Sequence, residues 1–218
     1  MFIGHFALGF AAKRAAPRVS LGILFIAAQL ADIVWPVLVA AGIEQVRIDP
    51  GNTAFTPLDF VSYPYSHSLL LLIVWGVVVG GGYRAVAGGR RTFVTLAALV
   101  VSHWLLDWVT HRRDMPLYPG GPKFGLGLWN SIPATVTVEV AMFAYGVWLY
   151  TRATRARDAL GRWGLVALVG VLALIYLANL AGGAPPSVTA IWIAGLVGAV
   201  IFMAWAWWVD HHRVVVGR

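Results

Sequence analysis

The sequence contains no cysteine and few charged residues, and both absences narrow the classes of protein that it can encode. Without cysteine the chain has no disulfide and no thiolate ligand, so any metal ion must be held by imidazole nitrogen and carboxylate oxygen. Charged residues make up 11% of the 218 residues, whereas 60% are hydrophobic and 11 are tryptophan. A soluble domain of this length needs far more polar cover, so the composition predicts a membrane protein.

Six stretches of the chain approach or exceed the roughly 20 apolar residues that cross a bilayer as a helix. They are residues 19–42, 66–83, 92–109, 134–150, 163–181 and 188–209. Residues 1–12 are also apolar but too short to span, and they precede a basic cluster instead of following one as in a signal peptide. We therefore expect an all-α polytopic membrane protein with about six transmembrane helices in one bundle and a short N-terminal half-inserted helix. No linker or internal repeat divides residues 1–218, which predicts a single domain.

Lysine and arginine are unevenly distributed over the predicted loops, and cytoplasmic loops are the ones enriched in these residues. If the N-terminus is inside, the outer loops carry only Arg47, Arg112, Arg113 and Lys123, and the rest of the 16 basic residues, including Arg218, lie inside. This distribution predicts that both termini are cytoplasmic. The Ala, Gly, Val and Arg content suggests a bacterial plasma membrane. The net charge of +7 then reflects topology and contact with anionic lipid, and no basic-aromatic pattern for nucleic acid is present.

Several polar residues lie inside or beside the apolar stretches, where an ionisable side chain is costly and therefore a candidate functional residue. They are Asp32, the sequence Ser66-His67-Ser68, and the pair His103 and Asp107. His103 and Asp107 are four residues apart, so they share one face of a helix and can converge on a single ion. The topology places all of them in the outer half of the membrane. We therefore interpret Asp32, His67, His103 and Asp107 as ligands of a divalent metal ion, with zinc as the leading candidate and manganese or iron as alternatives.

Three further residues extend this predicted site. His5 reaches it as a ligand only if the N-terminal segment rises to about the midplane, and Glu139 could complete a second ion site or act as a general base. His111 lies four residues after Asp107 and so continues the helical face of His103 and Asp107. It could be a ligand, a proton donor or a solvated surface histidine. The hydroxyls of Ser66, Ser68 and Ser102 could hold hydrogen bonds that orient the imidazoles.

Each of these residues also has a simpler interpretation. A lone intramembrane histidine or carboxylate often makes only an interhelical hydrogen bond. Asp32 lies four residues before Pro36 and could merely satisfy the backbone at a kink. His211 and His212 stand beside the basic C-terminus and are interpreted as a solvated tail.

The order of these residues resembles that of the membrane-bound metal-dependent hydrolases, also described as LexA-binding inner-membrane hydrolases. That family has an early His, an Asp in the first span, a Thr-or-Ser-His-Ser element, and His-x-x-x-Asp followed by Thr and a Pro-rich loop. The corresponding positions here are His5, Asp32, Ser66-His67-Ser68, His103-x-x-x-Asp107, Thr110 and the loop 116–119. The family is in turn distantly similar to zinc-dependent phospholipases C. The resemblance implies hydrolysis of a lipid-borne ester or phosphoester at the outer leaflet.

Two other classes of protein would also place histidines and carboxylates in a membrane. An ion- or proton-coupled transporter does so, although here the polar residues gather on one side of the bilayer and no repeat is visible. A non-catalytic membrane scaffold could keep a closed structural metal site or a buried polar network. Membrane lipid is the expected surrounding and possible substrate, whereas the oligomeric state does not follow from the sequence.

Overall fold

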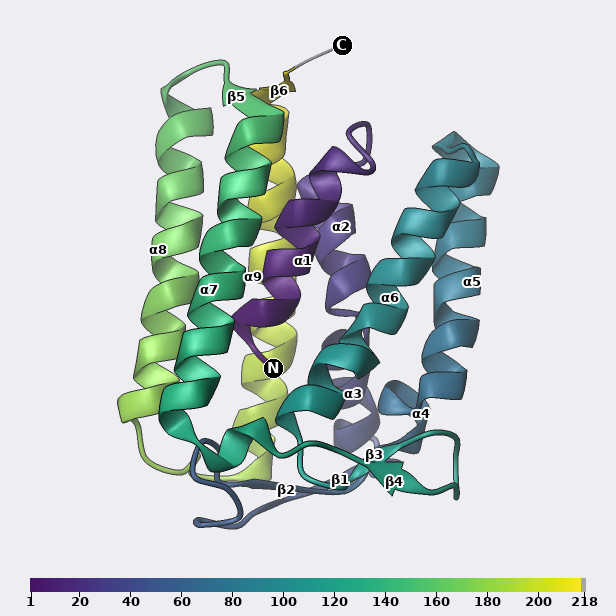
Figure 1. The fold of residues 1–218 in the computed structure, drawn as a ribbon, viewed down its shortest axis with the longest axis vertical. Coiled ribbons are helices and arrows are strands. Elements are labelled where there is room, and N and C mark those ends of the chain that lie inside the picture. Colours follow the sequence, from purple (N-terminus) through teal and green to yellow (C-terminus); the bar gives the residue numbers. More distant parts are fainter. Residues whose placement is uncertain (217–218) are drawn as a thin grey trace.

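The computed structural model describes residues 1–216, and its helices form one bundle with short strand pairs at the two ends (Figure 1). Arg218, counted among the inner basic residues, lies outside the described residues. The α-helices are α1 Ile3–Ala11, α2 Leu21–Ala28, α3 Leu30–Ala40, α4 Pro64–His67, α5 Leu69–Ala87, α6 Arg90–Thr110, α7 Ile132–Ala153, α8 Ala159–Ala181 and α9 Val188–His211, with 3-10 turns η1 Ala12–Arg14 and η2 Leu128–Asn130. The predicted all-α class is confirmed.

The long helices have the length and apolar character that a membrane span requires. Within residues 1–216, five helices, α5 to α9, meet both conditions, and α2 with α3 makes a sixth if the bent pair is counted as one span. Their outward side chains are large and apolar: Val78, Leu174 and Val200 are 56%, 65% and 71% exposed. Exposed apolar surface of this extent is stable only in contact with lipid or another protein, which supports a multi-pass membrane protein.

The first predicted span is broken, and the break does not lie at its proline. α2 and α3 meet at an angle of 59°, and the junction is Gln29, which has non-helical backbone angles. Pro36 lies inside α3 and cannot donate a backbone hydrogen bond to the carbonyl of Asp32, one turn earlier. Asp32 lies three residues after this break, in the first turn of α3.

The N-terminal helix α1 lies inside the bundle and packs mainly against α7 (Figure 1). Seven of its nine residues are buried, so most of this helix is covered by its neighbours. Gly146 on α7 permits this contact, because a Cβ atom there would come within 2.3 Å of the carbonyl oxygen of Ala7. At the other end of α1, Lys13 forms a buried ion pair of 2.5 Å with Asp210 of α9. These contacts fix how far α1 reaches along the bundle.

Paired strands and loops close both ends of the bundle (Figure 1). At one end β1 Gln45–Ile48 pairs with β2 Leu58–Ser62, and β3 Met115–Pro116 pairs with β4 Lys123–Phe124, both antiparallel. At the opposite end β5 Thr154–Ala156 pairs with β6 Arg213–Val215. The second predicted span begins at Leu69, later than expected, because Ser66 and His67 belong to the separate one-turn helix α4. The β1 to β4 end is the end that holds the candidate site.

Candidate metal centre

The five predicted metal ligands come from four elements and meet at the same end of the bundle. His5 lies on α1, Asp32 in the first turn of α3, His67 at the end of α4, and His103 and Asp107 near the end of α6. Their ligand atoms form two groups, one of His5, His103 and Asp107 and one of Asp32, His67 and His103. Within each group all ligand atoms lie within 4.8 Å of one another. Because His103 belongs to both, the groups form one cluster that could hold a metal ion.

The carboxylate of Asp107 stands at the centre of this cluster. Its Oδ1 accepts a hydrogen bond of 2.5 Å from the amino group of Met1 and lies 3.1 Å from Nε2 of His5. Its Oδ2 lies 3.2 Å from Nε2 of His103 and 3.8 Å from Nε2 of His67. Asp107 is almost fully buried, so its charge depends on these partners and not on water.

Asp32 forms the exposed side of the cluster. Its Oδ1 lies 3.5 Å from Nε2 of His67 and 3.7 Å from Nε2 of His103. The Asp32 side chain is 42% exposed, whereas the two imidazoles are 3% exposed or less. A bound ion would therefore be reachable from outside the bundle on the Asp32 side.

Hydrogen bonds behind the rings determine which imidazole nitrogen of His103 and His67 faces the carboxylates. Nδ1 of His103 lies 2.9 Å from the carbonyl oxygen of Ala28, which can only accept. Nδ1 of His67 lies 2.7 Å from the hydroxyl oxygen of Ser66, and that hydroxyl donates to Glu44 at 2.6 Å. Both Nδ1 atoms therefore carry the proton, and in the neutral rings both Nε2 lone pairs face the carboxylates.

This arrangement fits a divalent cation. Lone pairs on His67 and His103 that face the carboxylates of Asp32 and Asp107 repel them unless positive charge lies between them. Nε2 of His103 is buried and has no hydrogen-bond partner among the described residues. Imidazole nitrogen and carboxylate oxygen are a ligand set of zinc, and one hydrogen-bonded nitrogen behind each ring is the usual support of a ligating histidine.

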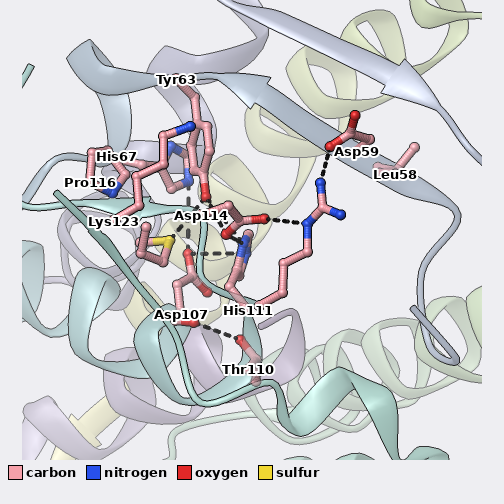
Figure 2. A network of polar contacts seen from close by, with 12 residues as sticks. Leu58, Asp59, Tyr63, His67, Asp107, Thr110, His111, Asp114, Pro116 and Lys123 are labelled. Carbon is pink, nitrogen blue, oxygen red and sulfur yellow. Dashed lines mark hydrogen bonds and ion pairs between the residues drawn. The ribbon is translucent and has the colours of Figure 1, made fainter. Parts of the chain in front are cut away.

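His111 lies at the edge of the cluster, at the start of the loop after α6 (Figure 2). Its Nδ1 is 3.0 Å from Oδ1 of Asp114, and its Nε2 is 4.0 Å from Oδ2 of Asp107. The ring packs on Trp129 with the ring centroids 4.2 Å apart and is 3% exposed as a residue. The interpretation as a solvated surface histidine is therefore wrong, which leaves the roles of ligand and proton donor.

Asp114 is itself held by a network of polar groups (Figure 2). The Tyr63 hydroxyl donates to Oδ1 of Asp114 at 2.8 Å, and Nε of Arg112 lies 3.4 Å from Oδ2. Burial and then the charge of Asp114 raise the pKa of Tyr63 well above its ordinary value, so this hydroxyl stays a donor. Arg112 also pairs with Asp59, so its guanidinium joins the carboxylates of Asp59 and Asp114.

Glu139 is buried on α7 and holds the start of α1. Its Oε2 accepts hydrogen bonds from the backbone N–H groups of Phe2 at 2.9 Å and Gly4 at 3.3 Å. Its Oε1 is buried without a partner among the described residues. Glu139 belongs to neither ligand group and instead orients the helix that carries His5. Its role as general base stays a prediction.

Sequence reasoning missed three residues that orient the predicted ones. Glu44 accepts hydrogen bonds from Ser66, and Asp114 with Tyr63 positions His111. Glu44 follows the first apolar stretch, where a single acid is typical of a loop, and nothing in the sequence connects it with Ser66. Asp114 lies only three residues after His111, and that spacing was the one available signal.

A cavity of about 420 Å³ opens beside the ligands. It is bounded by the loop between β1 and β2, by the end of α8 and by Trp129, and Asp32, His67, Asp107 and His111 face it. The candidate ligands thus lie at the wall of a cavity, whereas a closed structural metal site needs no such opening.

Replacing Ser66 by alanine is expected to weaken zinc binding about 10–100-fold, the usual cost of losing a residue that orients a ligating histidine. The hydroxyl of Ser66 is the group that fixes the ring of His67. Affinity would be measured by competition with a chromophoric chelator in detergent.

Ser102→Ala is the matched control for this experiment, because within the described part of the chain the hydroxyl of Ser102 bonds the carbonyl of Leu99 alone. Ser68 does not orient an imidazole either, because its hydroxyl oxygen accepts a hydrogen bond from the backbone N–H of Leu71 at the start of α5. Equal zinc affinity of Ser66→Ala and Ser102→Ala would contradict the orienting role.

A comparison of the chain with models of known protein families, with characterised proteins and with solved structures finds no match. The fold and the cluster define a polytopic helical membrane protein with buried histidine and aspartate groups that could hold a metal ion. The resemblance to the membrane-bound metal-dependent hydrolases stays a prediction that rests on the residues quoted for it.

Proposed function

We propose that the protein is a membrane-embedded, metal-dependent hydrolase that acts on a lipid-borne ester or phosphoester. One observation carries the proposal: Nε2 atoms of His67 and His103 converge on Asp32 and Asp107 at the wall of a cavity. A structural metal site would be enclosed by protein ligands, whereas this cluster has an exposed side at Asp32.

In this proposal Asp32, His67, His103 and Asp107 hold one divalent ion, and His5 contributes to a second position beside Asp107. Zinc fits the nitrogen and oxygen ligands best, with manganese or iron as alternatives. The ion would supply Lewis acidity toward the scissile group and a lowered pKa for the attacking water.

His111 is the residue that moves protons in this scheme. Its Nδ1–H is held by Asp114, so Nε2 faces the ligands and the cavity. Nε2 takes a proton from the attacking water, whose oxygen bonds to the acyl carbon or phosphorus. The bond from that carbon or phosphorus to the leaving oxygen then breaks, and Nε2 returns the proton to the leaving oxygen. Glu139, whose Oε1 has no partner among residues 1–216, is the second candidate for this role.

The proposed substrate is a lipid because the helices around the site present apolar side chains outward. The basic residues that the sequence assigns to the inner side, such as Lys13 and Arg152, lie at the end of the bundle opposite the site. By the excess of positive charge on cytoplasmic loops, the site would face the outer leaflet of a bacterial plasma membrane.

The test is release of a head group or fatty acid from phospholipid nanodiscs that contain the purified protein, loaded in turn with zinc, manganese and iron. Mass spectrometry of the soluble and lipid fractions would follow the products. We expect turnover in the loaded wild type, loss after chelation, and none in His103→Ala. If no loaded form releases either product from phosphatidylglycerol or phosphatidylethanolamine, the proposed phospholipid hydrolysis is wrong.

A further inference from the structure

A second cavity, of about 450 Å³, runs along the bundle among α1, α3, α8 and α9. Most of its lining is apolar, and one wall is the α9 face formed by Ala194, Gly195, Gly198 and Ala199. Because the side chains on this face of α9 are small, an extended acyl chain has room between the helices. We refer to this cavity as the α9 groove.

Gln29, at the break between α2 and α3, and Trp35 form part of the wall of the α9 groove. Gln29 is 4% exposed and Trp35 is 8% exposed. Their polar atoms Oε1 and Nε1 are buried and are not accessible from the groove, so they provide no hydrogen bond to a molecule bound there.

The α9 groove is continuous with the candidate metal centre. Phe2, Asp32 and Asn179 line both the groove and the cavity beside the ligands. A molecule whose apolar chain lies in the groove would therefore have its polar end at Asp32. An apolar cavity with a few placed polar groups is the usual form of a site for an amphiphilic ligand.

We propose that the α9 groove binds one acyl chain of the lipid substrate. The head group then lies at Asp32, beside the ligands. The statement that this lipid is the substrate rests on the proposed hydrolase function, whereas binding of the chain does not.

Gly198→Leu is the variant that tests the groove. A Cβ atom at Gly198 would meet only the ring of Phe202, at 3.8 Å, so the leucine side chain fills the groove without displacing backbone. Gly170→Leu on α8 is the matched control, because a Cβ atom there has no neighbour within 4 Å and Gly170 does not line the groove. Gly195 is unsuitable, since its Cβ would meet Pro36 at 3.3 Å.

The first measurement compares turnover of long-chain phosphatidylglycerol with that of bis(p-nitrophenyl) phosphate, a water-soluble diester without a chain. We expect the ratio of the two kcat/KM values to fall at least about tenfold in Gly198→Leu, because one blocked methylene-sized contact is already worth roughly 10–200-fold in discrimination. Gly170→Leu should keep the wild-type ratio. Equal ratios in all three proteins would overturn the proposal.

The second measurement does not depend on activity. Phosphatidylglycerol with a diazirine in one acyl chain would be photo-cross-linked to the protein in nanodiscs, and the labelled peptides would be mapped. We expect label on peptides of α3 and α9 that is lost in Gly198→Leu and kept in Gly170→Leu. Unchanged labelling in Gly198→Leu would contradict binding of the acyl chain in the α9 groove. Specific labelling without turnover would support acyl-chain binding in the groove and contradict the hydrolase function.

Discussion

Alanine at His103 or at Asp107 is expected to remove bound metal from the protein, the largest effect that the cluster predicts. His103 belongs to both ligand groups, and Asp107 contacts three of the histidines through its two oxygens. Losing a ligand should cost more than the roughly 10–100-fold in affinity that a supporting residue costs. Metal content would be measured by inductively coupled plasma mass spectrometry on detergent-purified protein, with near-stoichiometric metal expected in the wild type.

The control for adventitious binding is the double variant His211→Ala with His212→Ala. Both histidines lie at the end of α9, where His211 bonds the carbonyl of Trp207 and His212 bonds Asp158. This variant should keep the metal of the wild type. No metal in the wild type after reconstitution with zinc, manganese and iron would contradict the metal centre and assign the buried groups to proton coupling or helix packing.

Glutamine at His111 is expected to lower kcat about 10²–10⁴-fold, the range in which a positioned acid or base contributes to catalysis. Glutamine keeps much of the shape of the ring contact with Trp129 but cannot exchange a proton at the Nε2 position. The metal content of the variant should stay at the wild-type value, because His111 belongs to neither ligand group. Steady-state kinetics and metal analysis on the same preparation would measure both quantities.

The same variant also decides between the two remaining roles of His111. Loss of metal together with activity would show that His111 is a metal ligand. An unchanged kcat would exclude His111 both as a ligand and as a proton donor. Asp114→Asn is the companion variant, because Asp114 accepts from Nδ1 and fixes which nitrogen of His111 faces the site. We expect its kcat to fall as well, with metal content unchanged.

Two buried carboxylates in and behind the cluster have hydrogen-bond donors that offset the cost of burying their charge. Asp107 accepts from the amino group of Met1, and Glu44 accepts from two backbone N–H groups and the Ser66 hydroxyl. A buried carboxylate without such partners costs several kcal/mol. The hydrogen bonds of Glu44 therefore stabilise its buried charge and, through Ser66, also orient His67.

The sequence by itself determined the membrane class, the long helices and the residues of the cluster. These follow from local properties: an apolar run of about 20 residues has few alternatives to a spanning helix, and His103 with Asp107 must share a helical face. Ionisable residues inside or beside such runs are rare enough to be recognised singly, so the sequence alone indicates Asp32 and His67 as candidate ligands.

Only the tertiary structure decided how these residues meet. Contacts between residues far apart in the chain decide four features. They are the break at Gln29, the position of α1 inside the bundle, the hydrogen bonds that connect Glu44 with His67, and the groove along α9. Hydropathy and helical periodicity carry no information about which faces of two helices pack together. The close approach of α1 to α7 at Gly146, for example, brings His5 to Asp107 across more than 100 residues of sequence.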